Sequence, residues 1–207
     1  AGRTGEGDQR VMTEMPTTPG DWRQWDEPNG KWENYMGMIG EDSNRIPSIN
    51  PPFENEGQEM GAYIHHHMAC RLLGKDHSLP SMNDLVASSK YVDHLMMEFV
   101  DKNVEEILAV EASLPHPHDN ERKVRLDLIA YCKDHDGECT IIDWKFVKNK
   151  FYFNNYYEQM ELYKKAYNEA HCRSFGPLLS DVLVVAINTD CDVAVESYGC
   201  MERRQYG

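Results

Sequence analysis

The spacing of apolar residues divides the chain into segments of helical and of strand character. Helical spacing predicts helices over about 57–73, from a cap at Ser81 onward, and over 155–171. Short apolar runs predict strands near 107–111, 123–132, 139–146, 182–187 and 193–198. The order of helices, three strands, a helix and two strands predicts an α/β protein, with a central mixed β-sheet flanked by helices.

Residues 1–56 show no sustained period. They are rich in Gly, Pro, Asn, Trp and acidic residues, so we expect an extended N-terminal arm with aromatic anchors such as Trp22, Trp25 and Trp32. Residues 57–207 are expected to form the globular domain. A chain of 207 residues is long enough to bury a core, and we expect one globular unit overall.

Two of the predicted strands carry acidic residues among apolar ones. Asp127 lies within the run Val124–Ala130, and Asp143 and Lys145 follow the apolar pair Ile141-Ile142. Because side chains alternate between the two faces of a strand, Asp143 and Lys145 are expected on the same face. Burying carboxylates in a sheet is unfavourable unless they are paired or bind a metal ion, so these residues are candidates for a site.

The loop between these two strands decides whether the two aspartates meet. Residues 133–138 are polar and include a Gly, which is typical of a hairpin loop. If the turn centres on His135, Asp127 lies directly opposite Asp143. A shift of one residue would put the two carboxylates on opposite faces. A shared site therefore requires an odd-length loop or a bulge, and disfavours a two-residue turn at Asp136-Gly137.

Two carboxylates on one face suit a hard divalent cation such as Mg²⁺ or Mn²⁺, and phosphodiester cleavage is a common use of such a site. Lys145 would then lie beside a metal-bound water and help to orient or deprotonate it. Glu111, at the end of an earlier predicted strand, is a candidate further ligand or a partner for Lys145. The alternative for these residues is a set of exposed charges at strand ends.

Two helical segments offer additional candidates. His65-His66-His67 lies on the first predicted helix, where neighbouring side chains diverge too far for all three to face one site; a solvated face is the alternative. Gln159 and Tyr163 are four residues apart and share a face of a later helix. They would organise the site from that side, or else be an interfacial Gln and a core Tyr.

The segment Phe146–Tyr157 interleaves aromatic and basic residues. It contains Lys148 and Lys150 and no acidic residue, with Tyr152 and Tyr156 among its aromatic side chains. Such a pattern suits stacking on unpaired bases and contact with phosphates, so these four residues are candidates for binding substrate. Packing of the aromatic rings into the core is the alternative.

The net charge of −14 narrows the function further. A protein that coats nucleic acid has a basic footprint, so this class is disfavoured, whereas an enzyme that holds nucleic acid locally is not. An acidic surface also suits a protein partner. No apolar run has the length of a membrane span, and the first residues lack the pattern of a signal peptide. None of the six cysteines forms a CxxC pair, which favours reduced thiols over a zinc ribbon.

Taken in order, these residues resemble the motifs of the PD-(D/E)XK nuclease superfamily, and most of all its RecB-type exonuclease branch, with phage exonucleases and the mitochondrial genome maintenance exonuclease group. The matching motifs are Gly61-x-x-x-His65, Val110-Glu111, Asp127, Ile141-Ile142-Asp143-x-Lys145 and Gln159-x-x-x-Tyr163. The resemblance covers about Arg45 to Tyr198. Arg125 departs from it, because the branch often has Gly two residues before the strand Asp.

The resemblance implies a restriction-endonuclease-like core and a divalent-metal-dependent deoxyribonuclease, an exonuclease acting on DNA ends. It implies that His65, Asp127 and Asp143 hold Mg²⁺ or Mn²⁺ and that Lys145 activates water, with Gln159 and Tyr163 organising the site. One alternative is a catalytically silent member that binds a protein or a DNA end, and another is an RNA endonuclease of the cap-snatching kind. The implied location is the cytoplasm, including that of a phage-infected cell, or the mitochondrial matrix.

Overall fold

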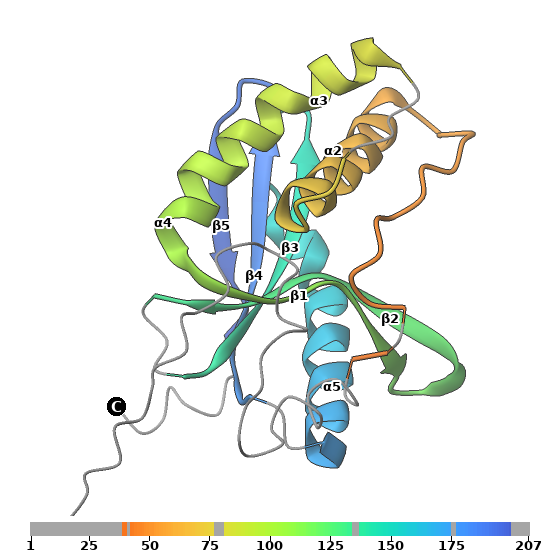
Figure 1. Cartoon of the computed structure of the whole chain (residues 1–207), viewed down its shortest axis with the longest axis vertical. Coiled ribbons are helices and arrows are strands. Elements are labelled where there is room, and N and C mark those ends of the chain that lie inside the picture. Colours follow the sequence, from red (N-terminus) through yellow and green to blue (C-terminus); the bar gives the residue numbers. More distant parts are fainter. Residues whose placement is uncertain (1–38, 41, 77–80, 134–136, 175–176, 200–207) are drawn as a thin grey trace, which may run out of the picture.

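The computed structural model describes residues 39–40, 42–76, 81–133, 137–174 and 177–199. It is a mixed α/β structure in which a five-stranded sheet lies between two layers of helices, as the sequence predicts (Figure 1). Most of the predicted N-terminal arm lies outside the described residues. None of the described helices combines the length and the apolar character needed to cross a membrane.

The five strands lie in the sheet in the same order as in the sequence. They are β1 (Val104–His116), β2 (Asp119–Cys132), β3 (Cys139–Val147), β4 (Leu179–Asn188) and β5 (Val193–Ser197). β3 and β4 are parallel and all other neighbours are antiparallel. A parallel pair needs a crossover, and the helix α5 (Tyr157–Ser174) supplies it. All five predicted strands are found, but β1 is much longer than expected.

The remaining helices precede the sheet. α2 (Glu56–Leu72) begins after Asn55, whose side chain accepts a hydrogen bond from the Gln58 amide. α3 (Met82–Leu95) begins at the predicted cap, where Ser81 accepts from the Asp84 amide. The sequence predicts a longer helix that carries Phe99 and Val104 toward the core, and the chain does stay helical as far as Asn103. The helix is not a regular α-helix throughout, because a π-helical turn, Met96–Val100, leads into the short α4 (Asp101–Asn103).

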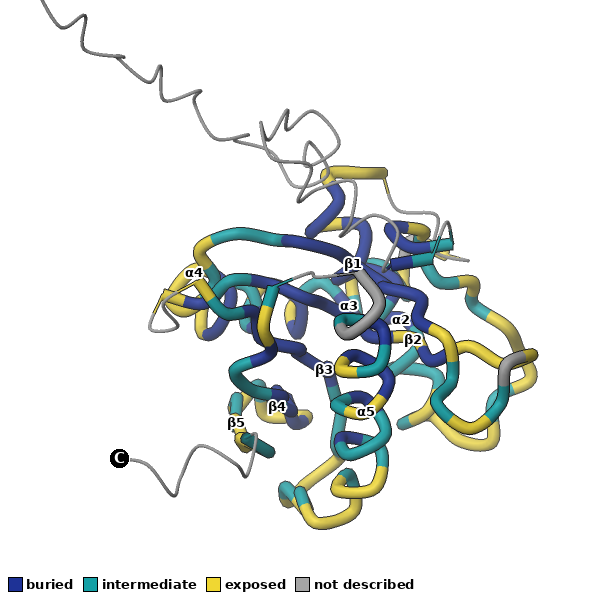
Figure 2. Tube along the Cα trace, turned by 90° about the horizontal axis from the view of Figure 1, so that it is seen from below, coloured by how far each residue is buried: buried dark blue, intermediate teal, exposed yellow. Residues whose placement is uncertain are grey.

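Each face of the sheet has its own apolar core. Trp144 lies in the core beneath α2 and α3, with its ring 6.0 Å from that of Phe99. Met160 and Tyr167 of α5 belong to the core on the other face. Figure 2 shows the buried positions gathered along the strands between these helices. Asp143 hydrogen bonds to α5, so its side chain and that of Trp144 leave β3 on opposite faces, as strand alternation predicts.

The register of the β2–β3 hairpin agrees with the sequence-based condition for a shared site. Leu128 pairs with Ile142, and Ile129 pairs with Ile141. Continuing this register by one residue puts Asp127 opposite Asp143. The predicted turn centre, His135, lies outside the described residues. The register is the one that an odd-length loop produces, so the two-residue turn at Asp136-Gly137 is excluded.

A short segment before α2 runs along the outer edge of β1. The Gly40 amide donates to the Ser113 carbonyl at 2.7 Å, and the Asn44 amide donates to the Val110 carbonyl at 2.7 Å. A Cβ atom on Gly40 would lie 3.0 Å from the Ser113 carbonyl oxygen, so this close approach favours glycine. This part of the expected arm is therefore bonded to the sheet.

Candidate metal centre

Three carboxylates lie side by side on three neighbouring strands. Val110 pairs with Leu128 and Ala112 with Leu126, which puts Glu111 of β1 opposite Asp127 of β2. The last β2–β3 pair, Leu128 with Ile142, lies next to Asp127 and to Asp143 of β3, so the register continued by one residue would place these two aspartates opposite each other. The three acidic residues are only 4 %, 7 % and 1 % exposed, in the order Glu111, Asp127, Asp143. Like charges so close together in a buried place repel one another unless a cation or protons compensate them.

The sheet opens at this row of carboxylates. The described pairs of β2 with β3 end at Leu128 and Ile142. Beyond them, the Asp127 Oδ2 atom accepts the Trp144 amide hydrogen at 2.8 Å, where a regular ladder would use a backbone carbonyl. A side chain thus replaces a rung of the ladder, and the two strands separate. This separation makes the carboxylates accessible to side chains from both helical layers.

Glu111 has an unusual backbone. Its φ angle is +52°, in the left-handed region, which is strained for a residue with a side chain. The strands change face here, because Val110 packs with the α2–α3 core and Ala112 with the α5 core. The side chains of Asn44 and Ser43 stabilise this backbone conformation from the segment before α2. The Val110 amide donates to Asn44 Oδ1 and the Ser113 amide donates to Ser43 Oγ, both at 2.9 Å.

Sequence reasoning did not single out Ser43 and Asn44. The only local signal was the polar run Asp42-Ser43-Asn44, whose side chains are of the kind that bond to backbone groups in turns. Their partners on β1 are 70 and 66 residues away along the chain. No local sequence pattern could therefore predict these contacts, which hold the backbone of β1 on both sides of Glu111.

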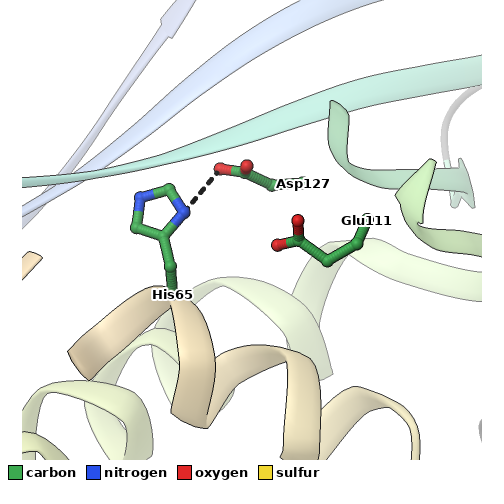
Figure 3. A group of neighbouring side chains, drawn as sticks. All are labelled: His65, Glu111 and Asp127. Carbon is green, nitrogen blue, oxygen red and sulfur yellow. Dashed lines mark ion pairs between the residues drawn. The ribbon is translucent and has the colours of Figure 1, made fainter. Parts of the chain in front are cut away.

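His65 brings α2 into the site. Its Nδ1 atom lies 3.3 Å from Asp127 Oδ2, and its side chain is 27 % exposed. His65, Glu111 and Asp127 each offer one ligand atom, and these atoms all lie within 4.8 Å of one another (Figure 3). His66 and His67 turn to other partners, the Pro47 carbonyl at 2.8 Å and Ser88 Oγ at 3.2 Å. Of the three histidines, His65 is the one that reaches the carboxylates.

Asp143, also predicted as a ligand, lies outside that group of three. Its Oδ2 atom is 2.5 Å from Lys145 Nζ, an ion pair in which Asp143 is almost fully buried. From α5, the Tyr163 hydroxyl donates to Asp143 Oδ1 at 3.3 Å, and Gln159 Nε2 donates to the Tyr163 hydroxyl at 2.6 Å. The four residues form a continuous polar chain. Lys145 thus pairs with Asp143, and Glu111, the other partner considered from the sequence, has Arg125 as its cationic neighbour.

The charges of the site are strongly coupled. Burial, with the neighbouring Asp127 carboxylate, raises the pKa of Glu111 from 4.5 to about 8. The same two causes raise the pKa of Asp143 from 3.8 to about 6. Burial also acts to raise the pKa of Asp127, but His65 outweighs it and lowers this pKa below its ordinary value. Asp127 in turn raises the pKa of His65 to about 9, against the effect of burial.

The predicted substrate-binding residues fall into two groups. The ring of Tyr156, which is half-buried, lies with its centre 5.4 Å from Lys145 Nζ, so it belongs to the site. Lys148, Lys150 and Tyr152 are exposed on the loop that follows β3. Lys148 Nζ is 3.5 Å from Glu56 Oε2, which connects this loop to the first turn of α2.

The donor set suits a hard divalent cation. One imidazole nitrogen and several carboxylate oxygens are ligands that Mg²⁺ and Mn²⁺ accept, and a cation would relieve the repulsion between the buried acids. Lys145 adds a cationic group at the edge of this set. No protein-family model matches the chain, and no curated protein is similar to it in sequence.

Proposed function

We propose that the chain is a divalent-metal-dependent deoxyribonuclease with a restriction-endonuclease-like core of the PD-(D/E)XK type, acting as an exonuclease on DNA ends. One observation carries the proposal: Glu111, Asp127 and Asp143 form a buried row across three strands, with His65 on α2 beside it and Lys145 against Asp143. A mixed five-stranded sheet with helices on both faces is compatible with such a core.

His65, Glu111 and Asp127 would hold Mg²⁺ or Mn²⁺, with Asp143 as a further ligand from the neighbouring strand. The ion would supply a Lewis acid for the phosphoryl oxygen and lower the pKa of a bound water. Lys145 Nζ would orient the attacking water and offset the negative charge that develops on the phosphorus oxygens. Tyr163 and Gln159 would fix the Asp143 carboxylate, and thereby the position of Lys145.

The substrate proposed is a DNA strand with a free end. Tyr156 lies beside Lys145 and offers an aromatic face next to the reacting phosphate. Lys148, Lys150 and Tyr152 would contact phosphates and unpaired bases further along the strand. Because the molecule carries a net charge of −14, long-range attraction to DNA is weak and binding relies on such local contacts.

The test is degradation of end-labelled linear and circular DNA, single- and double-stranded, in Mg²⁺, Mn²⁺ or EDTA. We expect metal-dependent loss of linear DNA, at least a hundredfold slower in Lys145→Ala and unchanged in Lys102→Ala, a matched exposed lysine on α4. Cleavage of circles as fast as of linear DNA would contradict the exonuclease assignment. Wild-type activity in Lys145→Ala would contradict the role of that lysine.

A catalytically silent protein of the same fold, binding a protein partner or a DNA end, is the second candidate. The acidic net charge favours it, because an acidic surface suits a basic protein partner better than it suits DNA. The intact set of Asp127, Asp143 and Lys145 argues against it. Absence of cleavage on every substrate and metal tested would select this candidate.

A further inference from the structure

Two cationic side chains contact one partly exposed carboxylate, that of Asp42, and a third cation lies nearby, against Glu111 of the candidate metal centre. Lys123 of β2 forms an ion pair with Asp42, and Arg45 NH1 lies 3.4 Å from the same carboxylate. The pKa of Asp42 is lowered chiefly by its hydrogen bond to Lys123 and by the charge of that lysine, with smaller contributions from Arg45 and Arg125. This cluster therefore has three positive charges, of which two are paired with Asp42.

Arg125 connects this cluster to the candidate metal centre. Its NH1 atom lies 3.4 Å from the Glu111 carbonyl and 4.0 Å from Glu111 Oε2, across the β1–β2 pair. Lys123 and Arg125 alternate along β2 with two residues that pack in the α5 core, so both cations project from the other face. They lead along one strand toward Asp127, with the guanidinium of Arg125 next to a candidate ligand.

We propose that Arg45, Lys123 and Arg125 form a phosphate-binding track for a nucleic-acid strand, in which Arg125 contacts the phosphate next to the metal centre. This inference rests on the proposed function, because the strand is the substrate of that centre. A guanidinium group matches the geometry of a phosphate and binds it through two parallel hydrogen bonds. Arg125 thus takes a role at a position where the related branch often has Gly.

The exposure of the three side chains suits this role. Arg45, Lys123 and Arg125 are 67 %, 57 % and 44 % exposed. Ion pairs this exposed are weak, so a phosphate can replace Asp42 as the partner of Arg45 and Lys123. The track lies on β2 and on the segment before α2, whereas the loop that follows β3 and carries Lys148 contacts Glu56 in the first turn of α2.

The test compares two double variants with the same change of charge. Arg45→Gln with Lys123→Gln removes two track cations without touching the Glu111 contact. The control, Arg71→Gln with Lys102→Gln, removes two exposed cations that are ion-paired with Asp93 and Glu98. The affinity of each protein for a short single-stranded DNA is measured in Ca²⁺ over a range of salt concentrations, and its melting temperature is measured with and without Mg²⁺.

Each phosphate contact on a single strand contributes about 0.7 to the slope of log affinity against log salt. The slope of the track variant should therefore be shallower than that of the wild type by about 1.4. The ratio of the wild-type affinity to the variant affinity should then fall about sevenfold between 50 and 200 mM salt. The control should match the wild type. Stabilisation by Mg²⁺ should be the same in all three proteins, because none of the four substituted residues is a candidate ligand.

Two results would overturn the track. The first is an affinity and a slope in the track variant equal to those of the control. The second is binding of polyglutamate as tight as that of DNA and equally dependent on Arg45 and Lys123, which would assign the surface to an acidic protein. Failure of the proposed function gives a different result. In that case the slopes of the track variant and the control still differ, but Mg²⁺ does not stabilise the wild type and does not support cleavage.

Discussion

Glu111 combines burial, a left-handed backbone and an acidic neighbour in one residue. Each of these raises the free energy of the folded protein, and a residue with a purely structural role would gain nothing from them. A site that binds a cation does gain, because the ion reverses the electrostatic cost. We therefore interpret Glu111 as a residue that lowers the stability of the folded protein in the absence of a cation and favours the binding of one.

In the absence of metal, the titration of Glu111 should make the free energy of unfolding depend on pH. Its pKa is about 8 in the folded protein against an ordinary value of 4.5, so the folded state holds this proton more tightly than the unfolded state. The free energy of unfolding should thus fall as the pH rises from about 5 to 8, by on the order of a few kcal/mol from this group. Asp143, with a pKa of about 6, and His65, with a pKa of about 9, act in the same direction.

Denaturant unfolding in EDTA at pH 5 and pH 8.5 measures this effect. In Glu111→Gln the fall should be clearly smaller, because the carboxylate that takes part in it is gone while the size of the side chain is kept. An equal fall in the variant and the wild type would show that Glu111 titrates normally.

Asn44 should matter for the metal as well as for stability. Asn44→Ala leaves the buried Val110 amide without its acceptor, which costs about 1–3 kcal/mol, and it adds backbone strain because the φ angle of Asn44 is +58°, in the left-handed region. It also releases the backbone beside Glu111, so the stabilisation by Mg²⁺ should become smaller. Asn103→Ala is the control, since it removes a hydrogen bond from Asn103, at the end of α4, to the Phe99 carbonyl in the π-helical turn. Equal metal-induced shifts in the two variants would mean that Asn44 has a structural role only.

At the scale of elements, the features that the sequence predicts are those that residues close together in the chain determine. The Ser81 cap and the alternation that separates Asp143 from Trp144 follow from nearby residues. The hairpin register was only a condition for a shared site, and the pairing of Leu128 with Ile142 meets that condition. Three features escape prediction: the full length of β1, the π-helical turn after α3, and the contacts that Gly40, Ser43 and Asn44 make with the sheet edge. The last of these depends on contacts between residues far apart in the sequence, which no period or motif encodes.

The candidate site divides in the same way. Asp127, Asp143 and Lys145 could be chosen from strand patterns alone. The strand and helix patterns do not distinguish among the three histidines; the motif resemblance points to His65, and the orientation of α2 brings this residue to Asp127. The role of Arg125 needed the β1–β2 pairing, because only that pairing brings its guanidinium to Glu111.

The link between α5 and β3 predicts a selective effect of Tyr163→Phe. The variant keeps the buried ring in the core and loses only the hydroxyl between Gln159 and Asp143. Cleavage should fall about tenfold or more, since Asp143 and Lys145 lose their fixed geometry. Thermal stability should change by no more than about 1 kcal/mol. Full activity in the variant would exclude α5 from the working site.

At the scale of the whole molecule, an acidic protein is proposed to act on an acidic polymer. The net charge of −14 opposes association, so the metal ion and the few cations near it must supply the attraction. The arrangement of the fold is consistent with attraction that is confined to the site and the cations near it. The sheet brings three acids together, and α2 and α5 lie on opposite faces of it (Figure 1). Two cations of the track, Lys123 and Arg125, lie on β2, and the third, Arg45, lies on the segment before α2.

The central claim is that the carboxylate row binds a divalent cation, and calorimetric titration with Mn²⁺ tests it most directly. Asp127→Asn keeps an oxygen to accept the Trp144 amide but loses the charge, and Asp181→Asn is the matched control, a strand aspartate whose side chain also accepts a backbone amide. We predict one site in the wild type and in Asp181→Asn, and binding at least tenfold weaker in Asp127→Asn, about 1.4 kcal/mol or more. Equal Mn²⁺ affinity in all three proteins would contradict the claim.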